Sequence, residues 1–221
     1  MPRLLLVPLA LLALTSTAHA GDKFEQELDK AAAILKDVGE QVPKPLRAAA
    51  RCVSVMKISK GGFVFGGVGG TGWVTCRDPG GTKWSAPLVL DIAGGSAGAQ
   101  IGGQTIELIM IHKELNDAAS VAHATPVFQG SVSATAGEVG GGASAGADPA
   151  AEATVFTFHK SKGLYAGAVG EHFVVKPSDK LNAELYGGKV DNEAVLVRRA
   201  VKHPPQAKKF LAAVAAFVAG K

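Results

Sequence analysis

Several features that mark common classes of protein are missing from this sequence of 221 residues. The two cysteines, Cys52 and Cys76, have no neighbouring ligand pattern, and the histidines show no H-x-x-x-H spacing. We therefore expect no metal site and no cofactor. The apolar run at residues 4–14 is shorter than the ~20 residues that a membrane-spanning helix needs. No internal repeat of ~20 to 50 residues indicates a solenoid or propeller.

The N-terminus has the pattern of a secretory signal peptide. Arg3 supplies a positive charge, residues 4–14 form an apolar segment, and Ala18-His19-Ala20 is a small-x-small cleavage site. We expect cleavage after Ala20, which leaves residues 21–221 as one domain. The mature protein would then lie in the periplasm, at the outer-membrane surface or outside the cell.

Basic residues are unevenly distributed, although the formal net charge is only +4. Residues 44–77 and 198–221 contain Lys and Arg but no Asp or Glu, whereas acidic residues concentrate between 22 and 40. Basic segments of this kind favour anionic partners, and export removes most nucleic acid from reach. We predict peripheral binding to anionic membrane lipid; a merely solvated basic face is the alternative. The candidate headgroup ligands are Lys44, Arg47, Arg51, Lys57 and Lys60.

The apolar periodicity predicts an α+β fold. We expect a strongly bent antiparallel sheet or partial barrel, because short β-branched runs alternate with glycines, flanked by N- and C-terminal helices. The expected helices are residues 22–41, 45–50, 114–122, 178–185 and 205–219. The expected strands are residues 52–58, 63–68, 73–76, 88–92, 104–111, 127–138, 155–159, 165–175 and 194–198, with a loop at 140–151.

The two cysteines are candidates for a disulfide, since an oxidising compartment permits one. Cys52 begins the first expected strand and Cys76 ends the third, so a hairpin could bring them together. Two buried thiols are the alternative.

Two short motifs resemble catalytic or cofactor signatures. Residues 67–72 match G-x-G-x-x-G, but the Trp73-Val74-Thr75-Cys76 that follows favours a strand over the helix that a dinucleotide site requires. Residues 94–98 match G-x-S-x-G around Ser96, yet a β-branched run follows them, where a nucleophile elbow requires a helix. A secreted serine hydrolase that uses Ser96 remains the least favoured alternative, and we predict no enzyme.

Several linked motifs resemble the SYLF domain family. They are the glycine-rich segment 57–67, Trp84-Ser85-Ala86-Pro87, the glycine-rich segment 94–104, residues 161–167, and the N-x-x-x-Y-G element at 182–187. The resemblance covers about residues 30–200. It implies a lipid-binding module, since eukaryotic members bind phosphoinositides and some associate with actin, whereas bacterial members are exported. It also implies that Ser96 belongs to a strand connection and has no catalytic role.

Two departures from the family limit what the resemblance implies. Ile106-Glu107 replaces the Thr-Asp usual in the family. The N-terminal helix is acidic, whereas eukaryotic relatives use a basic amphipathic helix to bind lipid. The predicted function is non-catalytic binding of an anionic phospholipid or a phosphoinositide-like headgroup at the cell envelope; a structural or interaction protein of the envelope, with a protein partner there, is the alternative.

Overall fold

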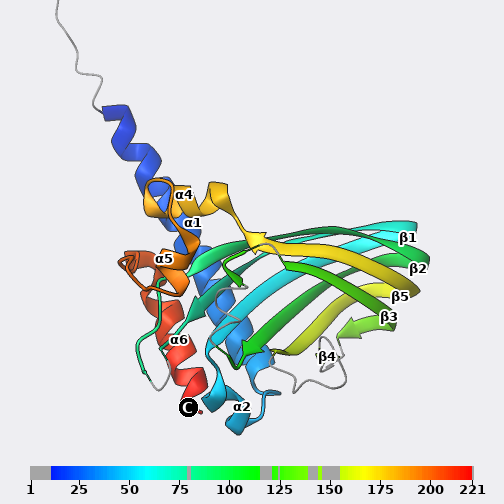
Figure 1. The fold of residues 1–221 in the computed structure, drawn as a ribbon. Helices are drawn as coiled ribbons and strands as arrows, with labels where there is room; N and C mark the ends of the chain where they lie inside the picture. The colour runs from blue at the N-terminus through cyan, green and yellow to red at the C-terminus, as the bar shows by residue number, and fades with distance from the viewer. Residues whose placement is uncertain are drawn as a thin grey trace, which may run out of the picture.

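The computed structural model describes residues 11–78, 81–114, 121–123, 125–138, 144–145 and 155–220. In residues 11–20, 100, 125–138, 144–145 and 164–173 only the backbone is described. The described strands form one antiparallel sheet in the order β1-β2-β5-β3, with the short β4 (Ser144–Ala145) also on β5. Helices gather at one end of this sheet, and the far ends of its strands project away from them (Figure 1). The predicted α+β class and the bent, open antiparallel sheet are confirmed.

Strand β1 (Cys52–Cys76) reverses direction within its own length. A straight strand of 25 residues would span roughly 80 Å, yet the Cα atoms of Cys52 and Cys76 are 4.0 Å apart. The two halves lie side by side, because a methyl group on Gly70 would approach the Lys57 carbonyl oxygen to 2.2 Å. The reversal is tightest at Gly62, where a methyl group would lie 2.4 Å from the Gly66 Cα atom.

The neighbouring strands follow β1 around this reversal. Strand β2 (Leu88–His112) pairs with both halves of β1, and β5 (Val155–Pro177) pairs with both halves of β2. The separate short strands expected from the sequence within 52–76, 88–112 and 155–177 are therefore wrong, because each series is one continuous strand bent near its middle. Strand β3 (Thr125–Glu138) completes the sheet and confirms the strand predicted at 127–138.

Most of the predicted helices are present. They are α1 (Leu11–Gly39), α2 (Lys44–Ala49), α4 (Asp179–Tyr186), a 3₁₀ turn η1 (Pro205–Ala207) and α6 (Lys208–Val218). The predicted start at Asp22 is wrong, because α1 continues through the preceding Leu- and Ala-rich residues, which are strong helix formers. Most of the helix predicted at 114–122 and of the loop at 140–151 lies outside the described residues. None of the helices in the described ranges is both long and apolar enough to cross a membrane.

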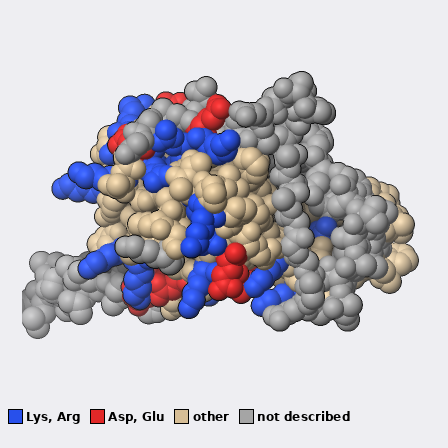
Figure 2. Space-filling view, turned by 90° about the horizontal axis from the view of Figure 1, so that it is seen from below, with Lys and Arg blue, Asp and Glu red and all other residues tan. Residues whose placement is uncertain are grey.

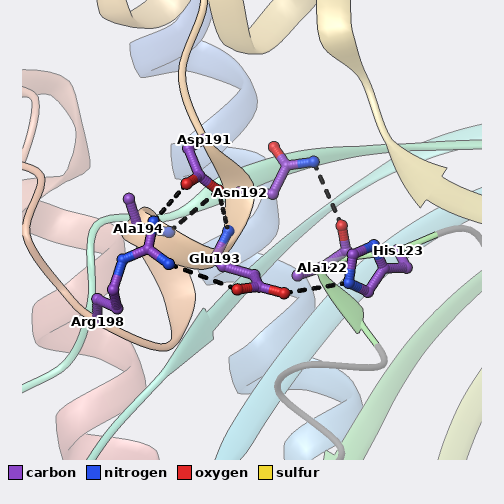
Figure 3. Close-up of polar contacts among 7 residues, drawn as sticks. All are labelled: Ala122, His123, Asp191, Asn192, Glu193, Ala194 and Arg198. Carbon is purple, nitrogen blue, oxygen red and sulfur yellow. Dashed lines mark hydrogen bonds and ion pairs between the residues drawn. The ribbon is translucent and has the colours of Figure 1, made fainter.

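The strand predicted at 194–198 is wrong, because those residues belong to or follow helix α5 (Asn192–Leu196). The Asp191 side chain caps this helix by accepting hydrogen bonds from the backbone amides of Glu193 and Ala194. Arg198 then bridges Asp191 and Glu193, as Figure 3 shows. On the other side, Glu193 and Asn192 contact residues 122–123, which fastens α5 to the segment after β2.

The two faces of the sheet are buried by different helices. One face, with Val55, Trp73 and Ile109, shares a core cluster with the apolar sides of α1 and α6. The other face, with Met56 and Leu90, packs with the buried residues of α5. This alternation follows from the period of two in a strand. The apolar face of the C-terminal helix is buried, and its members are Phe210, Leu211, Val214, Phe217 and Val218.

Candidate functional site

The two basic segments of the sequence meet at the helical end of the molecule. Arg47 of α2 lies over the aromatic ring of Phe217 in α6, with 5.1 Å between its guanidinium carbon and the ring centroid. Lys44 is exposed at the start of α2, next to Gly220 at the end of the chain. Figure 2 views this side of the molecule and shows Lys and Arg side chains over its helical half.

Asp78 links the two basic segments directly. Its backbone carbonyl oxygen accepts a hydrogen bond of 3.0 Å from Arg51, and its carboxylate forms an ion pair with Arg199. Arg77 lies beside Arg51, and it donates to the carbonyl oxygens of Ala50 and Ala48 at the end of α2. Burial and then the charge of Arg51 lower the pKa of the Arg77 guanidinium. Arg77 therefore stabilises the position of α2, and its charge is partly used within the fold.

A groove of about 380 Å³ opens between α1, α2 and α6, beside these basic residues. Its walls are mainly apolar and include Leu35, Ala213, Ala216 and Phe217. Arg47 lies on its lining, fixed by a hydrogen bond of 2.7 Å from its Nε to the Val42 carbonyl oxygen. Lys36 and Glu40 line the groove as well. Apolar walls beside a fixed guanidinium suit an amphiphile with an anionic head.

The five predicted headgroup ligands do not form one patch. Lys44, Arg47 and Arg51 lie at the helical end, whereas Lys57 and Lys60 lie further along β1. Lys60 is only 7% exposed, which does not suit contact with a headgroup at the surface.

Lys57 is exposed but lies in a row of mixed charge. It is paired in register with Glu107 of β2, which is paired with Lys160 of β5. Lys160 in turn binds Asp37 of α1 at 2.5 Å. The acidic neighbours weaken any attraction of this row for anions.

Acidic residues of α1 engage the second basic segment. Lys209 of α6 lies 3.1 Å from Asp29 and 3.3 Å from Glu25. The hydrogen bond to Asp29, followed by the one to Glu25, raises the pKa of Lys209. Lys202 and Lys208 are exposed nearby, so the basic end presents positive charge to the solvent.

The two catalytic-type motifs lie within strands. Residues 67–72 form part of the returning half of β1, and no helix follows them. Ser96 is buried inside β2, in register with Gly66 of β1 and Glu171 of β5. The strand-turn-helix geometry of a nucleophile elbow is therefore absent at Ser96.

The N-x-x-x-Y-G motif binds the start of β2. The buried Asn182 side chain accepts from the Val89 amide at 2.8 Å and donates to the Val89 carbonyl oxygen at 3.0 Å. Tyr186, one helical turn later, donates to the Pro87 carbonyl oxygen at 2.5 Å, and burial raises the pKa of its hydroxyl. Gly187 ends α4 in the left-handed conformation, with φ of 73°. This motif maintains the fold.

Sequence reasoning missed an exposed apolar cluster at the bend of the sheet. Phe63, Val64 and Phe65 lie at the reversal of β1, and Ile101 of β2 is paired in register with Phe63. The three consecutive apolar residues Phe-Val-Phe, flanked by pairs of glycines, could have identified this cluster. Successive side chains of a strand point to opposite faces, so all three can be buried only where both faces are covered.

Comparison with known proteins gives a consistent set of relatives. Residues 93–217 match a family model described as "Ysc84: Las17-binding protein actin regulator". Protein YSC84 of Saccharomyces cerevisiae is 30% identical over 199 residues, which cover 85% of this chain and 42% of that protein. LAS seventeen-binding protein 3 of the same yeast is 32% identical over 167 residues, or 74% of this chain and 36% of that protein.

A human relative extends the similarity beyond fungi. SH3 domain-containing YSC84-like protein 1 of Homo sapiens is 31% identical over 175 residues, which cover 73% of this chain and 50% of that protein. The chain thus spans half or less of the length of these three relatives. No solved structure gives a significant match.

Proposed function

Because this chain belongs to the Ysc84 family, the SYLF family of the sequence resemblance, we propose that it is a non-catalytic protein that binds anionic membrane lipid at the cell envelope. The groove between α1, α2 and α6 carries this proposal, since it combines apolar walls with the fixed guanidinium of Arg47. An acyl chain would lie against Phe217 and Ala213, and a phosphate would meet Arg47 and Lys44. Export by residues 1–20 would bring the protein to such lipids.

The charge at this end supports an anionic headgroup. Near an anionic surface each exposed Lys or Arg contributes ~1 kcal/mol, and this attraction falls off within ~8 Å at physiological salt. Lys44, Lys202 and Lys208 are exposed at the helical end and can reach such a surface. Binding through this end should therefore weaken as salt rises.

Vesicle sedimentation with phosphatidylglycerol or phosphatidylcholine tests the proposal. We expect preference for the anionic vesicles, and Lys44→Glu should reduce it severalfold. Lys180→Glu on α4 makes the same charge change on an exposed residue outside the groove, and it should have little effect. Equal binding to both vesicles at all salt concentrations would refute the proposal.

A groove-filling variant separates a bound acyl chain from surface attraction alone. Ala216 lies on the groove lining and is half-buried, so Ala216→Trp should fill the groove without entering the core. We expect it to lower uptake of a fluorescent fatty-acyl phosphatidylglycerol. Unchanged uptake would show that the groove holds no acyl chain.

Protein interaction is a second candidate, because the description of the family and the name of one relative, LAS seventeen-binding protein 3, describe binding to another protein. An envelope protein would be the corresponding partner of this chain. Under this alternative, the mature protein would bind neither vesicle but would sediment with envelope membranes that retain their proteins.

A further inference from the structure

The bend of the sheet carries a cluster of exposed apolar side chains, the tip cluster, made of Phe63, Val64, Phe65 and Ile101. Their exposed fractions are 72%, 46%, 75% and 60%. Single exposed apolar residues are common on soluble proteins, but a contiguous aromatic group marks an interaction surface. The tip cluster lies at the end of the sheet opposite the helices (Figure 1).

The backbone at the tip cluster is strained. Val64 has a φ of 65°, in the left-handed region that a β-branched residue rarely adopts. Glycine would relieve this strain, and glycines stand on both sides of the triplet. Strain of this kind points to a functional constraint when it coincides with an unusual surface.

Charged residues are missing from every strand segment around the tip cluster. In β1 the sequence is uncharged over residues 61–76, in β2 over 92–106 and in β5 over 163–170. The strand register brings these segments together, since Phe63 pairs with Ile101, which pairs with Ala166. Lys60, three residues from Phe63, is only 7% exposed, and the nearest exposed charge on β1 before the bend is Lys57, six residues or roughly 20 Å along an extended strand from Phe63. That length exceeds the ~5–10 Å to which interfacial segments enter a bilayer.

The geometry points to insertion of the tip cluster into the headgroup and acyl boundary of a lipid bilayer. Phe63 and Phe65 would enter the apolar layer, with Ile101 beside them. The inference rests on the proposed function only in that the ligand is again a membrane lipid; the surface is different and needs no headgroup charge.

A protein partner or a second copy fits the tip cluster less well. A stable protein interface buries ~800 Å² on each partner and surrounds its apolar centre with a polar rim. Four projecting side chains on an uncharged, glycine-rich bend provide neither that area nor such a rim. A bilayer requires no complementary shape, so a narrow apolar projection is sufficient for it.

A tryptophan at the tip provides a direct test. The two native tryptophans, Trp73 and Trp84, are buried and serve as an internal background. We expect vesicle-bound Phe65→Trp to be quenched by lipids brominated on their acyl chains, and the unsubstituted protein to be quenched far less. Equal quenching of the two bound proteins would overturn the inference and leave the proposed function standing.

Serine variants test whether the insertion contributes to affinity. Phe63→Ser with Phe65→Ser should lower affinity for vesicles at least about tenfold in high salt, where charge attraction is screened but burial of apolar area is not. All proteins compared carry the same N-terminus, and circular dichroism checks their folding. Unchanged affinity of the double variant would overturn the inference. So would self-association of the unsubstituted protein on gel filtration that the double variant loses, because a second copy would then cover the tip cluster. Absence of binding to any vesicle by the unsubstituted protein would overturn the proposed function and the inference together.

Discussion

Reduction of the bond between Cys52 and Cys76 should destabilise the protein substantially. The disulfide joins the two ends of β1, with a sequence separation of 24, and thus closes the loop that carries the tip cluster. Chain-entropy bookkeeping for a loop of this length gives about 3.5 kcal/mol of stabilisation, through restriction of the unfolded chain. For a domain of this size the midpoint of thermal unfolding should fall by about 10 °C.

Urea unfolding with and without a reductant measures this difference on one protein. Reduction is a cleaner change than substitution, because both cysteines are fully buried and their replacement also alters packing. The variant with Cys52→Ala and Cys76→Ala is the control, since a reductant should not change its midpoint. A difference below ~1 kcal/mol between the oxidised and reduced protein would refute the reasoning, because the unfolded chain would then gain little freedom from reduction.

Three further predictions follow from named contacts and from the backbone. Asn182→Ala should lower the free energy of unfolding by about 2–3 kcal/mol in urea titrations, since it leaves a buried backbone amide and carbonyl without their partner. The hydrogen bond from Arg198 lowers the pKa of Asp191, so this carboxylate contributes stability above its unfolded pKa of ~3.9 and loses it as pH falls through the lower folded value. Asp191→Asn should therefore reduce acid sensitivity below about pH 4 in thermal melts. Gly98, with φ of 146°, should not tolerate valine, whereas Ser96→Ala should cost about 1 kcal/mol at most; ester turnover lost only in Ser96→Ala would instead establish a hydrolase.

The sequence was sufficient to predict fold class and most helices, because these depend on local patterns. The helices at 22–41, 178–185 and 205–219 were predicted from apolar periodicity, and the Ser178 side chain caps α4 at the predicted start. Helix α5 was missed because its short apolar run also fits a strand. Its helical form depends on the cap from Asp191 and on the contacts of Glu193 with Arg198 and His123 (Figure 3).

The bends of the strands were located poorly for a different reason. Glycines are scattered through 61–72, and each one is compatible with a turn. The structure uses one reversal in β1, and it needs other glycines, such as Gly70, where the two halves approach closely. The pairing with β2 decides which glycines lie at the reversal and which only allow the two halves of β1 to approach. This pairing joins distant parts of the chain, so local sequence does not reveal it.

The candidate site was predicted in part. Charge distribution identified Lys44, Arg47 and Arg51, which the structure brings to one end of the molecule. It could not show that Asp78 engages Arg51 and Arg199, or that α1 supplies Asp29 to Lys209, because these contacts join distant segments. Counting basic residues in a segment therefore overestimates the charge available to a ligand.

The groove and the tip cluster should act independently of each other. Arg51 and Phe63 are separated by roughly 40 Å along β1, several times the ~8 Å over which charge acts at physiological salt. When the tip cluster enters a bilayer, the basic end is therefore too distant to contribute to that contact. The two ends would then bind vesicles as alternative contacts, and salt should weaken only the contact of the groove. Lys44→Glu should therefore lower vesicle affinity mainly at low salt, and the two serine substitutions should lower it mainly at high salt. Large losses from both changes at the same salt concentration would mean that the protein lies along the membrane and touches it at both ends.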